Sequence, residues 1–212
     1  MRAPVPLLAL LLCYSSAVLA ADATKPHPHQ GVATKFSSPT QTAVTAAETA
    51  DLLSGKSVRK QVRYETGGRG IAIQDVKASS DAIWAVIRDF NSYPNWISNL
   101  ESCKVYQTSG DHTFVQFEIS ALGIGVEYFI DHTYKPTAGA MTWQLDYSRL
   151  SDLDDSTGYW LVYPAPGHDG YSRVEYTVDL RMSGWVPKMV EDMLANKGLE
   201  QATSWVKKQA EE

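Results

Sequence analysis

Three closely spaced aspartates form the densest group of side chains in this sequence that could do chemistry. They are Asp152, Asp154 and Asp155. Carboxylate oxygens are the ligands that Ca²⁺ prefers, but an EF-hand loop needs a glycine where Thr157 stands and a bidentate glutamate where Tyr163 stands. The pattern therefore favours a solvated hairpin loop, paired with Arg149, over a metal site.

Two histidines separated by one residue are the other possible metal ligands. His27 and His29 flank Pro28 in a polar stretch near the N-terminus. A His-x-His pair can hold a metal ion, but the sequence indicates neither a third ligand nor a geometry. We predict no metal site and no cofactor.

His132 is the one candidate catalytic residue. It shares a face of an expected strand with Tyr128 and Ile130, so it could act as a general base inside a pocket. A hydrogen-bonded core or rim histidine is the commoner arrangement. Cys103 has no evident histidine partner, so we expect a buried, inert thiol. The sequence contains no serine-hydrolase, zinc-protease or nucleotide-binding motif, and a non-enzymatic role is favoured.

Residues 1–20 have the features of a secretory signal peptide. Arg2 is followed by an apolar run over 7–13 and by a small-residue cleavage pattern that ends at Ala20. The segment is too short to span a bilayer, although an uncleaved anchor is the alternative. No other stretch is long and apolar enough to cross a membrane, so we expect a secreted or periplasmic protein. The net charge of −5 and the lack of a basic stripe argue against nucleic-acid binding.

The mature chain divides into an N-terminal segment and one domain. Residues 21–37 are polar and without period, which predicts a flexible tail. A capping pattern at Ser38 and the alanine-rich run that follows predict a short helix ending before Gly55. The segment 21–56 therefore precedes a domain at 57–212.

Within the domain, hydrophobic periodicity predicts an antiparallel sheet with few helices. We expect a turn at 67–70, a helix capped by Ser79 or Ser80, and a helical turn at 93–97. The predicted strands are 58–64, 71–76, 102–107, 113–120, 126–134, 141–147, 159–163 and 173–182. In the last strand apolar and polar residues alternate, which indicates one apolar face and one wet face.

Residues 185–212 read as one long C-terminal helix. Pro187 fits its first turn, and an apolar stripe runs along it at helical spacing. Gly198 interrupts that stripe at a cost of about 1 kcal/mol relative to alanine. Close packing against a strand or a break into two helices explains the glycine, and so does room left for a bound molecule.

Three motifs resemble the opening of the START-like superfamily, also called SRPBCC. They are Ile73-Gln74-Asp75-Val76-Lys77-Ala78-Ser79, Ile83-Trp84-Ala85-Val86-Ile87-Arg88-Asp89-Phe90 and Tyr93-Pro94-Asn95-Trp96. The resemblance is to the polyketide cyclase/dehydrase and coenzyme Q-binding branch, and it covers about residues 57–210. It implies an α+β helix-grip fold, in which a curved antiparallel sheet wraps around a long C-terminal helix. Lipid carriers, quinone binders, hormone receptors and cyclases share this fold, so the resemblance does not fix a function.

A cavity between sheet and helix is the site that this fold implies. We expect its ligand-binding residues to be Phe117, Tyr128, Ile130, Trp143, Leu145, Trp160, Tyr176, Val178, Val190, Leu194 and Gly198. Core packing is the alternative for the aromatic members of this set. The predicted function is a secreted binding protein for an apolar molecule such as a lipid, isoprenoid or quinone-like compound. A cyclase/dehydratase that uses the same pocket and a ligand-free structural or interaction domain are the alternatives.

Overall fold

The computed structural model of the chain describes residues 20–121, 123–182 and 198–212. Its main element is an eight-stranded antiparallel sheet in the order β1-β2-β8-β7-β6-β5-β4-β3. The strands are β1 Val58–Tyr64, β2 Gly67–Val76, β3 Leu100–Ser109, β4 His112–Ala121, β5 Ile124–Lys135, β6 Ala140–Leu145, β7 Leu153–Pro164 and β8 Ser172–Met182. The meander from β3 to β8 returns the chain to β2, which confirms the predicted antiparallel sheet.

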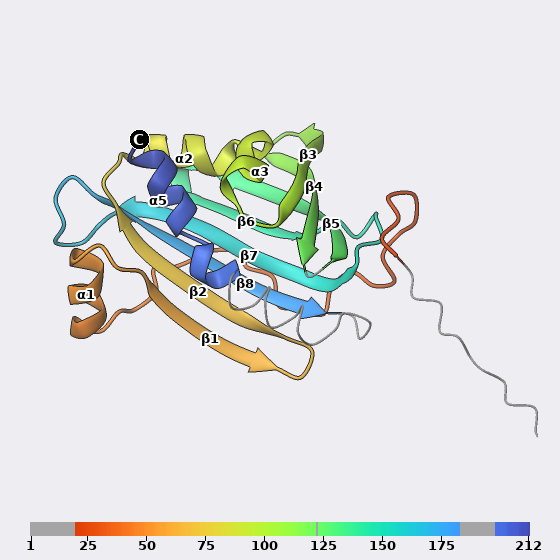
Figure 1. The fold of residues 1–212 in the computed structure, drawn as a ribbon, viewed down its shortest axis with the longest axis horizontal. Coiled ribbons are helices and arrows are strands. Elements are labelled where there is room, and N and C mark those ends of the chain that lie inside the picture. The colour runs from red at the N-terminus through yellow and green to blue at the C-terminus, as the bar shows by residue number, and fades with distance from the viewer. Residues whose placement is uncertain (1–19, 122, 183–197) are drawn as a thin grey trace, which may run out of the picture.

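The helices lie on both sides of this sheet. Figure 1 shows the sheet curving around α2, α3 and α5 on its concave side, with α1 at the side of β1 and β2. The helical elements are α1 Ala46–Leu53, α2 Ser80–Arg88, η1 Phe90–Ser92, α3 Tyr93–Trp96, η2 Pro136–Ala138 and α5 Ser204–Ala210. Among the described residues, none of the helices combines the length and apolar character needed to cross a membrane.

The helix α2 begins where the sequence predicts. The Ser79 side chain accepts a hydrogen bond from the Ala82 N–H at 3.2 Å, which satisfies one of the free amides at the helix start. Asp81 in the first turn and Arg88 in the last match the helix dipole. The buried face of α2 packs into the main core, which fills the concave side of the sheet.

The C-terminal helix differs from the single helix predicted over 185–212. Residues 198–201 are helical, Ala202 and Thr203 form a turn, and α5 follows. At the break, the buried Thr203 hydroxyl donates to Gln74 Oε1 at 3.0 Å. A break is therefore present, but at 202–203 rather than at Gly198. The predicted part at 185–197 lies outside the described residues.

Trp205 fixes α5 on the concave face of the sheet. Its ring lies 4.7 Å from that of Tyr93, 5.9 Å from that of Trp96 and 6.0 Å from that of Trp160. Lys207 Nζ also donates to the Asp75 carbonyl oxygen at 3.1 Å. These contacts place α5 against α3, β7 and the end of β2.

The prediction of a flexible tail at 21–37 is wrong. Asp22 forms an isolated antiparallel bridge with Leu150, and the His27 N–H donates to the Tyr147 carbonyl oxygen at 3.0 Å. Further along, the ring of Phe36 packs edge-on against that of Tyr159 at 5.1 Å. The tail prediction rested on polarity and missed these backbone contacts.

The first helix starts later than the capping pattern at Ser38 predicts. Thr45 and Glu48 form the capping box instead, with the Glu48 N–H 3.2 Å from Thr45 Oγ1 and the Thr45 N–H 2.7 Å from Glu48 Oε2. The residues before it are extended because they cover the sheet, where the Thr42 N–H reaches the Glu175 carboxylate at 3.1 Å.

The face of β8 that we expected to be wet is buried. The buried polar side chains on this face are Arg173, Glu175, Thr177 and Asp179. Arg173 pairs with both carboxylate oxygens of the buried Asp75, at 2.7 and 3.0 Å, and Arg69 pairs with Asp179 at 2.8 Å. Burial of these charges is tolerated because Arg173 and Asp179 are ion-paired, and Glu175 accepts hydrogen bonds from the Thr42 N–H and the Tyr163 hydroxyl.

The three clustered aspartates do not form a solvated loop. Strand β7 begins at Leu153, six residues before the predicted start, and Asp155 is fully buried. The Asp155 carboxylate accepts hydrogen bonds from the Val32 and Ala33 N–H groups at 2.7 Å. Arg149 pairs with Asp146 rather than with the cluster.

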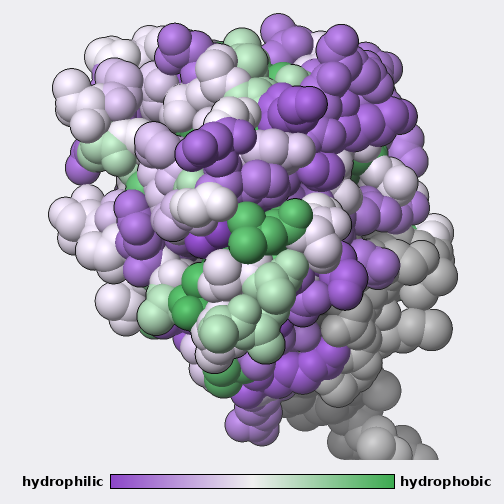
Figure 2. Space-filling view, turned by 90° about the vertical axis from the view of Figure 1, so that its left-hand side faces the viewer, coloured by the Kyte–Doolittle hydropathy of each residue, from purple (hydrophilic) through white to green (hydrophobic). Residues whose placement is uncertain are grey.

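The glycines at 67–70 belong to β2 rather than to a turn. The pairing of β2 with β8 runs from Gly67 to Val76 without a register shift. Figure 2 shows the end of the molecule where α1 lies: its surface is mostly hydrophilic, with a hydrophobic group near the centre of the view and smaller ones elsewhere.

Candidate ligand-binding cavity

A cavity of about 260 Å³ lies between the concave face of the sheet and the C-terminal segment. Its described lining comes from all eight strands, from α3 with the loop after it, and from residues 198–205. Most of these side chains are aliphatic or aromatic. The volume is close to the lower end of the range of about 300–1,000 Å³ for small-molecule pockets.

Cross-strand pairs of aromatic residues build much of the wall. Phe117 and Tyr128 are register partners in β4 and β5, and their rings stack at 5.2 Å with an angle of 11°. Trp160 and Tyr176 are partners in β7 and β8, with ring centroids 4.7 Å apart. Such pairs stabilise a sheet, and here they also present flat apolar surfaces to the cavity.

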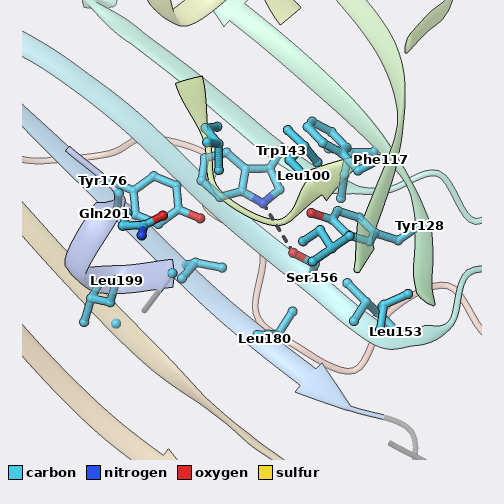
Figure 3. Close-up of a pocket in the computed structure, with 18 of the residues that line it drawn as sticks. Leu100, Phe117, Tyr128, Trp143, Leu153, Ser156, Tyr176, Leu180, Leu199 and Gln201 are labelled. Atoms are coloured by element: carbon cyan, nitrogen blue, oxygen red, sulfur yellow. Dashed lines mark hydrogen bonds between the residues drawn. The ribbon is translucent and has the colours of Figure 1, made fainter. Parts of the chain in front are cut away.

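Gly158 allows the indole of Trp143 to lie against β7. A Cβ at this position would be 2.6 Å from Cε2 of Trp143, and closer still to Cζ2 and to the Thr177 carbonyl oxygen. In this position the Trp143 N–H donates to Ser156 Oγ at 3.4 Å. In Figure 3 the hydroxyl groups of Tyr128 and Ser156 point toward the same part of the cavity as this N–H.

Gly198 faces open space, as the hypothesis of room for a bound molecule predicts. It lines the cavity, and a Cβ built on it meets no atom of the described residues within 4 Å. The close approach between helix and strand occurs beside it, at Gly70. A Cβ there would lie 3.0 Å from both Cδ atoms of Leu199. Close packing of Gly198 against a strand is therefore the wrong reading.

His132 is the one titratable residue other than tyrosine in the described lining. It is 6% exposed, and its Nδ1 has no hydrogen-bond partner among the described residues. Burial lowers its pKa from 6.5 to about 3, against an opposing contact with the Thr113 backbone. The rings of Phe90, Phe117 and Trp143 surround it at 4.8, 6.0 and 6.1 Å. The imidazole is therefore neutral at physiological pH.

The described lining contains no carboxylate, lysine, arginine or cysteine. His132 thus lacks the acidic neighbour that orients a histidine in acid–base catalysis. Cys103 is buried in the main core rather than in the lining, and burial raises its pKa from 9.0 to about 12. This agrees with the inert thiol that we expected. What the cavity offers is apolar surface with a few uncharged hydrogen-bonding groups.

The cavity brings most of the predicted site residues together. His132 and eight of the predicted ligand-binding residues line it, namely Phe117, Tyr128, Ile130, Trp143, Trp160, Tyr176, Val178 and Gly198. Leu145 does not line it, because this side chain is fully buried in the main core. Val190 and Leu194 lie outside the described residues.

Sequence reasoning missed several lining residues that its own patterns contained. Leu180 and Met182 continue the apolar face of β8, and Leu199 and Trp205 belong to the C-terminal apolar stripe. Ser156 lies in the first part of β7, before the start of the strand predicted from the sequence at residue 159. No pattern pointed to the loop after α3, where Asn99 has a φ of 66°.

The family model described as polyketide cyclase/dehydrase and lipid transport matches residues 71–204. That span includes most of the sheet and most of the cavity wall. The chain belongs to this family. No curated protein matches this member of the polyketide cyclase/dehydrase and lipid transport family.

Solved structures of low sequence identity share the helix-grip fold of this family member. A STAR-related lipid transfer protein from Xanthomonas axonopodis has a TM-score of 0.59 and 15% identity, and 74% of this chain matches 94% of that one. The Zhui aromatase/cyclase from a Streptomyces species has 0.56 and 13%, with coverage of 73% and 94%. A START superfamily protein from Mycobacterium smegmatis has 0.52 and 18%, with coverage of 73% and 97%. At these identities the likeness establishes the fold alone.

Proposed function

We propose that this domain is a binding protein for an apolar small molecule, such as a lipid, an isoprenoid or a quinone-like compound. The observation that carries the proposal is the cavity itself, whose described lining is mostly aromatic and aliphatic and holds no carboxylate, lysine or arginine. Water is poorly accommodated by such a surface, and an apolar ligand gains about 25 cal/mol for each Å² that it removes from water. Lipid transport also stands in the description of the family.

The polar groups of the cavity favour a ligand that carries one uncharged hydrogen-bonding group. His132 Nδ1 is buried without a hydrogen-bond partner among the described residues, and Tyr128 and Tyr176 line the same cavity. A buried polar group without a partner costs about 1–3 kcal/mol, so a ligand hydroxyl or carbonyl would recover part of that cost. A carboxylate is disfavoured, because the lining offers no cation to pair with it and the pKa of His132 keeps the ring neutral.

A cyclase/dehydratase that folds its substrate in the same cavity is the second candidate. His132 favours it, since a neutral imidazole with a free nitrogen inside an apolar pocket could take up a proton. Its pKa of about 3 makes it a weak base, far from the value near 7 that suits acid–base catalysis. The binding role therefore fits the cavity better. A ligand-free structural domain, the third candidate, leaves the open space beside Gly198 unexplained.

We also propose that the protein acts outside the cytoplasm after loss of residues 1–20, because their sequence pattern is that of a secretory signal peptide.

Binding can be tested with the purified mature protein, an apolar fluorescent probe and one matched pair of substitutions. Val178 lines the cavity, whereas Val62 in β1 is 59% exposed. Val178→Phe should fill part of the cavity and weaken probe binding about 10-fold or more, and Val62→Phe should leave it unchanged. Native mass spectrometry, followed by solvent extraction, would identify a co-purifying molecule. Equal probe binding by the two variants would refute the cavity as the site.

A further inference from the structure

Two histidines and an aspartate that are far apart in the sequence meet at the start of β7. His27 and His29 lie in the N-terminal segment, and Asp154 follows them by more than a hundred residues. One ligand atom from each of the three lies within 4.8 Å of the others. The sequence indicated no third ligand for the His-x-His pair, and the fold supplies one.

Hydrogen bonds from backbone N–H groups, one at His27 and one beyond His29, fix this group on the sheet. The His27 N–H donates to the Tyr147 carbonyl oxygen at 3.0 Å, and the Val32 N–H donates to the buried Asp155 carboxylate at 2.7 Å. The two imidazole rings stand at 89° to each other, with centroids 4.7 Å apart. The arrangement is therefore part of the folded domain rather than a chance approach of a loose tail.

The hydrogen bonds of His27 define which of its nitrogens is free. Nε2 lies 2.9 Å from the Asp154 carbonyl oxygen, which can only accept, so Nε2 carries the proton and Nδ1 carries a lone pair. This Nδ1 is buried and has no hydrogen-bond partner among the described residues, and His27 is 6% exposed. In metal-bound histidines, one ring N–H commonly donates to a backbone carbonyl while the other nitrogen binds the ion. His27 has the same hydrogen bond, and its other nitrogen is free.

His29 and Asp154 leave the group open to solvent. His29 Nε2 lies 3.1 Å from Asp154 Oδ1, and these side chains are 27% and 41% exposed. The Gly31 N–H donates to His29 Nδ1 at 3.0 Å, so in the free protein the proton of this ring is on Nε2 and points at the carboxylate. An ion can thus reach the group from the surface and take the place of that proton.

We propose that His27, His29 and Asp154 bind a divalent transition-metal ion, with Zn²⁺ as the representative case. Two imidazole nitrogens and one carboxylate oxygen suit Zn²⁺ and its neighbours in the series, whereas Ca²⁺ and Mg²⁺ prefer oxygen ligands alone. With bonds of about 2.0–2.2 Å, tetrahedral ligand atoms lie roughly 3.3 Å apart. His29 Nε2 and Asp154 Oδ1 are already 3.1 Å apart, so binding mainly requires the His27 nitrogen to approach them from within the 4.8 Å limit. The three ligands leave one position for water.

Metal binding has a specific consequence for Gly31. When Nε2 of His29 holds the ion, the ring proton moves to Nδ1. The Gly31 N–H then loses its acceptor, so the amide that is hydrogen-bonded in the free protein becomes unpaired or turns to a new partner. The ion also ties the N-terminal segment to β7, since its ligands come from both.

The test uses the full chain without a histidine tag, stripped with EDTA and titrated with Zn²⁺ in a calorimeter and by ¹H–¹⁵N NMR. We expect one ion per chain, with the Gly31 amide among the signals that shift most. Addition of Ca²⁺ or Mg²⁺ at the same concentration should change neither readout. The absence of stoichiometric Zn²⁺ binding, or equal binding of Ca²⁺, would overturn the proposal.

Variants assign the binding to these residues. His29→Asn and Asp154→Asn should each weaken Zn²⁺ binding by about 10-fold or more, and the second keeps a hydrogen-bonding group of the same size in place. His112→Asn is the matched control, because His112 also lies beside carboxylates, 2.7 Å from Asp131 and 3.6 Å from Asp111. Circular dichroism checks that each variant is folded. Unchanged Zn²⁺ affinity in a folded His29→Asn or Asp154→Asn variant, or an equal loss in His112→Asn, would refute the site.

Discussion

A single methyl group added at Gly158 tests the wall of the cavity. In Gly158→Ala the new Cβ would lie 2.6 Å from Cε2 of Trp143, whereas ordinary contacts begin at 3.4 Å. The indole must therefore move by about 1 Å or more. The Thr177 carbonyl oxygen, which is closer still, belongs to the β8 backbone and has no rotamer to relieve the contact.

The expected cost follows from these contacts. Overpacking of this kind costs about 1–3 kcal/mol, and a displaced indole loses its hydrogen bond to Ser156, worth about 1 kcal/mol. The lower backbone entropy of unfolded alanine returns about 0.4–1 kcal/mol. The free energy of unfolding should fall by roughly 1–3.6 kcal/mol, which lowers the Tm by about 2–14 °C in a chain of this size. The indole also moves into the cavity, so affinity for an apolar probe should fall.

Urea unfolding followed by far-UV circular dichroism, together with probe titration, measures both effects. Gly198→Ala is the matched control, since its Cβ meets no described atom within 4 Å. It should gain up to about 1 kcal/mol of helix propensity and keep its probe affinity. A Gly158→Ala variant as stable as the wild type, with normal probe affinity, would show that Trp143 does not lie against β7.

Three further predictions concern single residues. Cys103 should resist thiol reagents in the folded protein and titrate as one thiol after denaturation, because burial raises its pKa to about 12; rapid labelling of the native state would contradict this. Because the pKa of His132 falls from 6.5 to about 3 on folding, the unfolded chain binds a proton below pH 6.5 that the folded chain does not. The stability contribution present above pH 6.5 is lost toward pH 3, by about 2 kcal/mol at pH 5. His132→Phe should lack this part of the pH dependence, and identical pH profiles would refute the buried neutral ring. N-terminal sequencing of exported protein should begin near Ala21, and an intact Met1 would rule out cleavage.

Local periodicity was sufficient to predict the sheet. Alternation in β8 placed Tyr176 and Val178 on the face that lines the cavity, since side chains in a strand alternate with a period of two. The Ser79 cap and the apolar face of α2 are likewise local signals. The order of the elements also came from these local signals, and the resemblance to START-like proteins then favoured a cavity.

The contacts that the sequence did not reveal are between segments distant in the chain. Polarity alone predicts that Arg173 and Glu175 face solvent. Both are buried, because Arg173 pairs with Asp75 of β2 and Glu175 accepts a hydrogen bond from the Thr42 N–H. The residues around Gly158 do not indicate that a glycine is needed there. The need arises from the Trp143 indole on the neighbouring strand. The same limitation hid Asp154 as a partner of the two histidines.

The N-terminal segment that packs on the sheet, residues 32–42, also explains why β7 is apolar on both faces. Trp160 and Val162 point into the main core, while Tyr159 and Leu161 belong to a separate cluster on the opposite face with Phe36. A strand with one wet face would not need that second apolar set. The buried carboxylates nearby depend on the same cover, since Asp155 accepts hydrogen bonds from the N–H groups of residues 32 and 33. The matched family region begins only at residue 71, so this cover is an addition outside it. The sheet is therefore covered on both faces, by residues of the segment 32–42 on one face and by α2, α3 and α5 on the other. The described lining of the cavity lies on the second face.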